Sequence, residues 1–344
     1  MFRQLSSSRK ETQHGDATCL KGLLQTDIFD SYFFRRLPAI SARLVGALCC
    51  SSSGQNCRYQ ARAQLCAFLS PFSGVLSEIE SLCQLKCIMA DSKQSYDQFA
   101  AHYDQIFESW EASILRQATV LGGILQHECG DKQPIRALDC ACGIGTQSLG
   151  LAMKGFDVEG CDISSGAVQR APSEALKRGL NVPFSVANML QLSAVGRSSF
   201  DAVICIDNSL PHLESDEQLL QAAQQAHAKL RAGGSFIGSI RDYDRLVVER
   251  PTAEGPRFYS DSDKRRVVFQ LWDWLDERRY RFHLYITRST QSEWRTFHFT
   301  STYRAVLRSE LGDILTQAEF TNVRWLLPSD SAFYQPIFIA HRTC

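Results

Sequence analysis

Short apolar runs alternate with amphipathic stretches through the middle of the chain. The apolar runs have strand length and polar boundaries, and they cover 135–142, 157–163, 184–187, 200–206 and 235–240. Helical patterns lie between them at about 146–153, 166–178 and 215–230. The last of these helices opens on the capping pair Ser215 and Gln218, and we expect Gly233-Gly234 to end it. Strands that alternate with helices predict a parallel sheet with helices on both faces.

The pattern changes on either side of this region. Apolar and aromatic residues at helical spacing over 96–125 predict an amphipathic N-terminal helix or pair of helices. Three aromatic, β-branched runs with a period of two, 267–274, 280–287 and 297–303, predict antiparallel strands. A helix over 309–318 and strands over 323–327 and 336–340 follow. We therefore predict an α/β fold with a doubly wound, mostly parallel sheet and an antiparallel β insertion, about residues 245–305, after the fifth strand.

The first 88 residues have a different composition. They are rich in serine, hold seven of the thirteen cysteines and show no sustained helical or strand period. Met89 is the first methionine after Met1, and organised sequence begins directly after it. We expect residues 1–88 to be a disordered tail or an artefact of the gene boundary, with a mitochondrial transit peptide as the alternative. Residues 89–344 are expected to form the folded domain.

Charge and cysteine content narrow the class of protein. With 37 basic and 37 acidic residues, the chain has no positive excess to neutralise phosphates, so we expect a small-molecule substrate and no nucleic acid. No apolar run approaches the roughly 18 residues of a membrane-spanning helix, so we expect no membrane partner. Cys140 and Cys142 lack the further ligands of a zinc site, so we expect buried thiols and no metal. A cytoplasmic location fits, and a homo-oligomer stays possible.

A glycine-rich turn lies between the first strand and the helix after it. Gly143 and Gly145 carry no Cβ, so backbone there can approach a ligand closely, and the helix start presents unpaired N–H groups. Asp162 lies 19 residues beyond Gly143, where a doubly wound sheet places a carboxylate against ribose hydroxyls. An adenosine-containing ligand is therefore expected. Ser148 departs from the dinucleotide fingerprint, which has glycine or alanine at that position.

The segment 138–146, Leu-Asp-Cys-Ala-Cys-Gly-Ile-Gly-Thr, resembles motif I of class I S-adenosylmethionine-dependent methyltransferases. The resemblance implies a Rossmann-like, seven-stranded sheet over residues 89–344 and S-adenosylmethionine as the cofactor. In it, Asp139 is the acid at the strand end, backbone around the glycines faces the methionine part, and Asp162 holds the ribose. The implied cofactor residues of this core are Asp139, Ala141, Gly143, Gly145, Asp162, Ile163 and Ile206. A purely structural turn and a nicotinamide site are the alternatives.

Further stretches are similar to glycine and glycine/sarcosine N-methyltransferases. In that resemblance, Asn208 and His212 of the segment 203–213 border an amino-acid site, and Arg241 clamps the substrate carboxylate. A guanidinium suits a carboxylate because it donates two parallel hydrogen bonds. Tyr303 and Tyr334 match tyrosines that line the pocket. These five are the predicted catalytic and substrate residues.

Each of these assignments has a structural alternative. Asn208 can simply form a turn, and the tyrosines can be core residues. Arg241 can form a surface ion pair with Asp242 or Asp244. The family more often has asparagine where this chain has Asp242, and a second negative charge beside a bound carboxylate would weaken the clamp.

The same resemblance supplies the remaining cofactor contacts. Asn188 and Met189, after the third strand, match residues that meet the adenine. Tyr96, Tyr103 and Arg116 in the N-terminal segment are expected to close over the cofactor, with Arg116 on its carboxylate. The predicted reaction is methyl transfer to the amine of a small amino acid such as glycine or sarcosine. A thiol, carboxylate or natural-product acceptor is the alternative among enzymes, and a non-catalytic cofactor-binding protein is the alternative of another class.

Overall fold

The computed structural model describes residues 96–130, 133–261, 264–290 and 293–343. The predictions made for residues 1–88 lie outside the described residues. Residues 89–95, at the start of the predicted domain, also lie outside them.

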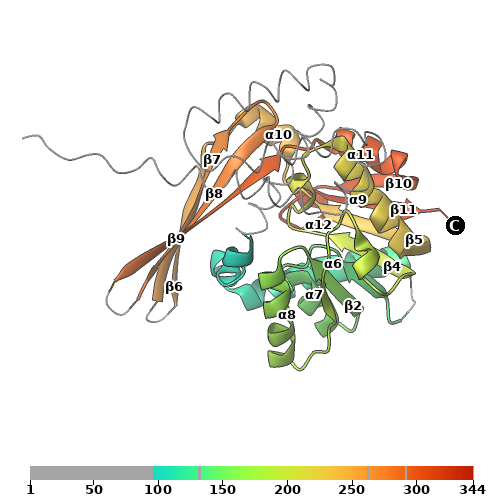
Figure 1. Cartoon of the computed structure of the whole chain (residues 1–344), viewed down its shortest axis with the longest axis horizontal. Helices are drawn as coiled ribbons and strands as arrows, with labels where there is room; N and C mark the ends of the chain where they lie inside the picture. Colours follow the sequence, from blue (N-terminus) through green and yellow to red (C-terminus); the bar gives the residue numbers. More distant parts are fainter. Residues whose placement is uncertain (1–95, 131–132, 262–263, 291–292, 344) are drawn as a thin grey trace, which may run out of the picture. The chain divides into compact units, whose positions relative to one another are not determined.

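Seven strands form the main sheet in the order β10-β11-β5-β4-β1-β2-β3 (Figure 1). Their bounds are β1 (Arg136–Asp139), β2 (Asp157–Asp162), β3 (Phe184–Val186), β4 (Phe200–Cys205), β5 (Leu230–Ser239), β10 (Phe320–Leu326) and β11 (Ile337–Arg342). All neighbours pair in parallel except β11, which is antiparallel to both β5 and β10. The strand order reverses between β1 and β4, where ligands bind in sheets of this kind. The doubly wound, mostly parallel fold is confirmed.

Helices cover both faces of this sheet because its strands are apolar on both sides. All six residues of β4 are buried. Ala202 and Ile204 join a core cluster with residues of α6 (Trp110–Cys129) and α7 (Thr146–Met153). Val203 and Cys205 join another, with residues of α9 (Asp216–Lys229) and α11 (Arg308–Gln317). Successive strand residues point to opposite faces, so this alternation builds a core on each side of the sheet.

A second sheet of four antiparallel strands follows β5 and the short helix α10 (Tyr243–Glu249). It consists of β6 (Ala253–Asp261), β7 (Lys264–Trp274), β8 (Arg279–Ser289) and β9 (Trp294–Arg304), each paired with the next. On its inner face, Trp272, Tyr280 and Phe282 are buried in the same core cluster as residues of α9 and α11. The predicted insertion is confirmed, with β6 as an additional strand. β6 was not predicted from the sequence because it contains Gly255-Pro256, and proline and glycine are rare within strands.

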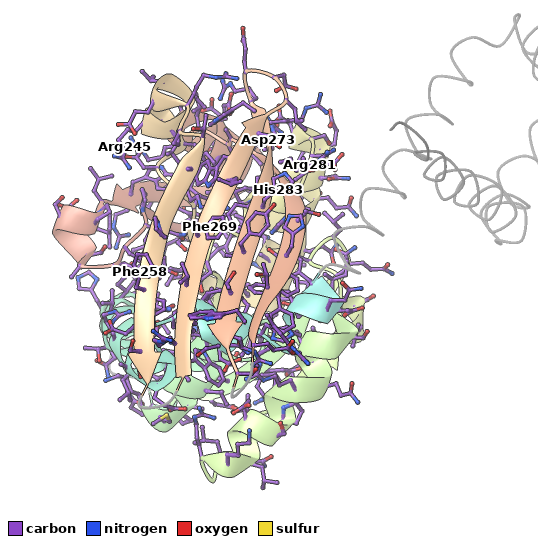
Figure 2. All side chains as sticks on the ribbon, turned by 90° about the vertical axis from the view of Figure 1, so that its left-hand side faces the viewer. Arg245, Phe258, Phe269, Asp273, Arg281 and His283 are labelled. Carbon is purple, nitrogen blue, oxygen red and sulfur yellow. The ribbon has the colours of Figure 1, made fainter. Side chains whose placement is uncertain are left out.

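Figure 2 looks onto the outer face of this second sheet. Phe258, Phe269, Asp273 and His283 lie on that face, and Phe258 is 74% exposed. His283 bridges the Asp273 carboxylate and the His298 ring, at 3.1 and 2.9 Å. The two faces therefore differ: the inner one joins the core, and the outer one carries polar and aromatic groups.

Two local predictions need correction. Gly233 and Gly234 do not end the helix: α9 ends at Lys229, and β5 begins at once with Leu230, which pairs with Phe200. The pairing and burial of Leu230 outweigh the helical pattern, and both glycines lie within the strand. The N-terminal helix is also interrupted. A 3₁₀ turn, η2 (Tyr103–Ile106), precedes α6, whose first turn is capped by the Ser109 side chain.

Candidate functional site

The glycine-rich turn joins β1 to α7 at the carboxyl edge of the sheet. Gly143 and Gly145 have φ of +53° and +98°, in the left-handed region that favours glycine. A Cβ on Gly145 would lie 3.1 Å from the Leu149 side chain, whereas a Cβ on Gly143 would enter open space. Gly145 is thus required by packing, and Gly143 leaves room for another group against the backbone.

Asp162 ties this turn to the end of β2. Its two carboxylate oxygens accept the N–H groups of Gly143 and Ser164, each at 2.8 Å. Burial raises the pKa of Asp162, and these two N–H groups oppose the shift because they stabilise the charged form. The carboxylate predicted to hold a ribose therefore also fixes the first glycine of the turn.

Asp139 lies at the end of β1 and is fully buried. The Ser148 hydroxyl donates to its carboxylate at 2.7 Å, which links β1 to the first turn of α7. Desolvation raises the pKa of Asp139 to about 7, against the lowering effect of hydrogen bonds from Ser148 and the Ala141 backbone. The serine that departs from the dinucleotide fingerprint is thus the hydrogen-bond partner of the acid in the motif.

The segment before α6 lies against the loop that follows β2. Asp97 accepts the Ser164 hydroxyl at 2.7 Å and the Gly166 N–H at 2.8 Å, at the start of α8 (Ser165–Lys177). A carboxylate is favourable at a helix N-terminus. Sequence reasoning missed Asp97, because its partners lie 67 and 69 residues away along the chain.

Three predicted residues meet in one hydrogen-bonded cluster. The Tyr96 hydroxyl lies 2.8 Å from Nε2 of His212 and 3.0 Å from the Tyr303 hydroxyl. Nδ1 of His212 lies 3.3 Å from the Ser301 hydroxyl. Desolvation lowers the pKa of His212 to about 4, so its ring is neutral at neutral pH. Burial raises the pKa of Tyr303 to about 12, so its phenol stays protonated.

Arg241 lies beyond β5 in an aromatic enclosure. Its guanidinium carbon lies 4.5 Å from the ring centre of Trp272 and 5.1 Å from that of Phe282, and Nη1 donates to the Tyr280 hydroxyl at 3.1 Å. Among the described residues, no carboxylate forms an ion pair with Arg241. The guanidinium keeps donors available for an anionic group.

The proposed ion pair of Arg241 with Asp242 or Asp244 does not form. Arg308 of α11 binds both carboxylates instead, Asp242 at 2.6 Å and Asp244 at 3.3 Å. The extra negative charge of Asp242 is thus compensated by a residue far along the chain, and the alternative reading of Arg241 is wrong.

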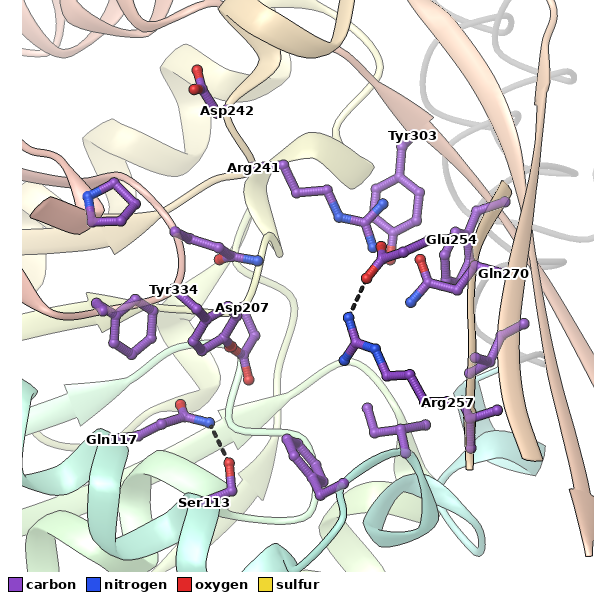
Figure 3. Close-up of a pocket in the computed structure, with 18 of the residues that line it drawn as sticks. Ser113, Gln117, Asp207, Arg241, Asp242, Glu254, Arg257, Gln270, Tyr303 and Tyr334 are labelled. Atoms are coloured by element: carbon purple, nitrogen blue, oxygen red, sulfur yellow. Dashed lines mark hydrogen bonds and ion pairs between the residues drawn. The ribbon is translucent and has the colours of Figure 1, made fainter. Parts of the chain in front are cut away.

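A cavity of about 940 Å³ lies between the main sheet, α6 and the second sheet (Figure 3). Six predicted residues line it: Tyr96, Tyr103, Arg116, Arg241, Tyr303 and Tyr334. Tyr334 is 53% exposed and stacks on Phe333, so it contributes an open part of the wall. Glu254, Arg257 and Gln270 of the second sheet add polar groups across from α6. The cavity has the size of a pocket for a small molecule.

The other predicted residues lie outside the cavity wall. The Asn208 Oδ1 atom accepts the Arg241 N–H at 3.0 Å, and Asn208 has φ of +65°. Asn208 is therefore both a turn residue and a support for Arg241. Asn188 Oδ1 accepts the Leu190 N–H at 2.9 Å, and the amide nitrogen of the Asn188 side chain takes no part in that hydrogen bond. The remaining members, Ala141, Ile163, Met189 and Ile206, are buried or half-buried near the strand ends.

Sequence reasoning also missed a polar cluster beside the cavity. Asp207 directly follows Ile206 at the end of β4, and it contacts Gln147 of α7 and Tyr103. Its position next to the predicted site residue Asn208 could have identified Asp207. An acidic residue in a turn has many structural roles, however, so this position alone did not indicate a function.

Cys140 and Cys142 are buried free thiols. Within the described ranges, no three His, Cys, Asp or Glu side chains are grouped as a metal site. No described helix combines the length and apolar character needed to cross a membrane.

Comparisons with known proteins agree with this geometry. Residues 137–234 match the family model of a methyltransferase domain. Human glycine N-methyltransferase is 33% identical over 169 residues, which cover 44% of this chain and 54% of that protein. The glycine/sarcosine N-methyltransferase of Parasynechococcus marenigrum is 36% identical over 110 residues, 32% of this chain and 39% of that protein. The chain thus spans about half the length of these relatives or less.

Solved structures share the fold. Streptomyces venezuelae DesVI has a TM-score of 0.59 at 18% identity, over 70% of this chain and 97% of that one. CalS10, an S-adenosylmethionine-bound amino pentose methyltransferase from Micromonospora echinaspora, has a TM-score of 0.56 at 18% identity, over 71% and 96%. The matched segment, the partial relatives and the shared fold all agree with the resemblance to class I S-adenosylmethionine-dependent methyltransferases.

Proposed function

We propose that this protein transfers a methyl group from S-adenosylmethionine to the amine of a small amino acid. The observation that carries the substrate class is Arg241, a guanidinium in an aromatic enclosure without a carboxylate partner among the described residues. A positive charge removed from water is costly, so this site favours an acceptor that brings its own carboxylate.

The residues present fit the cofactor. Open space faces Gly143, and the Asp162 carboxylate at the end of β2 accepts the Gly143 N–H. Asp162 would hold the ribose, backbone around Ala141 and Gly145 the methionine part, and Asn188 with Met189 the adenine. Arg116 at the cavity wall would take the cofactor carboxylate. When bound, S-adenosylmethionine supplies an electrophilic methyl group.

The chain's own contribution is positioning and the exclusion of water. Arg241 would fix the acceptor carboxylate, and Asn208 holds Arg241 through its backbone N–H. Tyr96 and Tyr303 line the cavity and, with the neutral ring of His212 hydrogen-bonded to Tyr96, would exclude water without protonating an amine. Positioning of this kind can supply roughly 7–11 kcal/mol of barrier reduction in favourable cases.

The test is production of S-adenosylhomocysteine by the full chain with glycine, sarcosine, dimethylglycine, neutral amines and thiols as separate acceptors. We expect turnover with amino acids and its collapse in Arg241→Leu. Turnover of amino acids that survives in Arg241→Leu would refute the clamp. Tight cofactor binding without turnover of any acceptor would favour a non-catalytic binding protein.

A second acceptor class is favoured by the size of the cavity. At about 940 Å³ it lies near the upper end for small-molecule pockets, and its far wall carries Glu254, Arg257 and Gln270. A larger natural-product amine would use that wall, as would an amino acid with a long polar side chain. Turnover only with neutral amines would select this alternative.

A further inference from the structure

A chain of hydrogen bonds runs along one wall of the cavity from α6 to the end of β4. Arg116 and Gln117 both donate to the Ser113 hydroxyl, at 3.4 and 3.1 Å. The Gln147 amide bridges Gln117 and the Asp207 carboxylate, with 2.8 Å to each acceptor. Figure 3 shows Ser113, Gln117 and Asp207 together on one side of the cavity, with Arg241 across from them. A positive and a negative group thus stand at the two ends of one connected polar wall.

Asp207 is held in an unusual way. Oδ2 of its carboxylate accepts Gln147 and, at 3.4 Å, the Tyr103 hydroxyl, whereas Oδ1 is buried and has no hydrogen-bond partner. Asp207 and Asn208 both have positive φ, +61° and +65°. Buried carboxylate oxygens without partners are costly, and strained backbone is concentrated at binding and catalytic sites. Both observations indicate that Asp207 is placed for a ligand.

The position of Asp207 indicates which ligand group it would bind. Gln147, its hydrogen-bond donor, stands two residues after Gly145 in the first turn of α7, so the carboxylate is fixed by the same element as the glycine-rich turn. Arg116, at the other end of the wall, has no ion pair among the described residues, and its side chain is exposed at the cavity. A wall with one cation and one anion complements a zwitterionic α-amino acid group.

We propose that Asp207 binds the α-ammonium group of the cofactor's methionine tail, with Arg116 on the carboxylate of the same tail. This inference rests on the proposed methyltransferase function and adds to it a side-chain carboxylate as the ammonium partner. Gln147 is a positioning residue that orients Asp207. Arg241, across the cavity, remains for the acceptor.

The experiment is calorimetric binding to the full chain, without turnover. Two ligands are compared: S-adenosylhomocysteine, which has the amino-acid tail, and 5′-methylthioadenosine, which keeps the adenosine and sulfur but lacks the tail. Asp207→Asn preserves shape and removes charge. Asp242→Asn is the matched control, because Asp242 is another cavity carboxylate and its partner is Arg308.

We expect Asp207→Asn to weaken S-adenosylhomocysteine binding about tenfold or more and methylthioadenosine binding less than about twofold. Asp242→Asn should change neither by more than about twofold. Equal losses for both ligands would overturn the inference in favour of a structural role. Unchanged binding of S-adenosylhomocysteine in Asp207→Asn would also overturn it, because the carboxylate would then have no part in holding the tail. A wild-type chain that binds neither ligand would refute the proposed function itself, which keeps the two failures distinct.

Discussion

Replacement of Arg241 by leucine isolates the contribution of one half-buried guanidinium. The side chain touches Trp272 and Phe282, so leucine would keep an apolar contact there, and the Tyr280 hydroxyl retains its partner Tyr243 at 3.0 Å. The fold should therefore survive the change. What is lost is the charge that would pair with an acceptor carboxylate.

The magnitude follows from the burial of that pair. Truncating one partner of a buried, hydrogen-bonded charge pair costs about 2–5 kcal/mol. With tenfold for each 1.4 kcal/mol, kcat/KM for an amino-acid acceptor should fall by about 30-fold at the low end and by more than 1,000-fold at the high end. Affinity for S-adenosylhomocysteine should stay within about twofold, because Arg241 stands apart from the glycine-rich turn.

The assay is the initial rate of S-adenosylhomocysteine formation, with calorimetry for the cofactor product. Arg245→Leu is the control, because Arg245 lines the same cavity but its side chain is 63% exposed, and its ion-pair partner among the described residues is Glu249 at 3.5 Å. Its kcat/KM should stay within about threefold, since exposed ion pairs contribute little. An Arg241→Leu enzyme within about threefold of wild type would refute the reasoning.

Three further predictions concern the cofactor side and the histidine cluster. Gly145→Ala should lower the free energy of unfolding by at least about 1–2 kcal/mol, because φ is +98° and Leu149 stands 3.1 Å from the new methyl group. Gly143→Ala, whose methyl group enters open space, should mainly abolish S-adenosylhomocysteine binding. Thermal melting measures the first effect and calorimetry the second. Burial raises the pKa of Asp207 to about 6, so affinity for S-adenosylhomocysteine should fall more steeply than affinity for methylthioadenosine as the pH drops below about 6 and Asp207 loses its charge; parallel pH profiles for the two ligands contradict this. The ring of His212 should show no titration in NMR between about pH 5.5 and 8, because burial lowers its pKa to about 4.

Much of the fold could be predicted from the sequence because its signals are local. A glycine pair after a short apolar run marks the turn at Gly143, and the distance to Asp162 follows from the length of one strand–helix–strand unit. Apolar alternation likewise identified β7, β8 and β9. These patterns depend on neighbours within a few residues, so one sequence suffices to read them.

The missed features depend on contacts between distant parts of the chain. Arg308 lies 66 residues beyond Asp242, and Asp207 lies 60 residues beyond Gln147. No spacing rule connects such pairs, since the fold alone brings them together. The helix end near Leu230 was predicted to within one residue, but the early start of β5 was missed because Leu230 pairs with Phe200, a distant residue of β4.

The second sheet has a consequence for how this protein can diversify. All four of its strands come from one continuous stretch, Ala253 to Arg304, whereas the residues at the cofactor turn and its supports are spread from Asp97 to Asp207. Substitutions confined to that stretch reshape one wall of the cavity and leave Asp162 and Gly143 untouched. Exchange of this stretch would therefore change the wall around the acceptor while keeping both the cofactor turn and Arg241, so grafting it from a relative is a practical route to altered specificity among acceptors that carry a carboxylate.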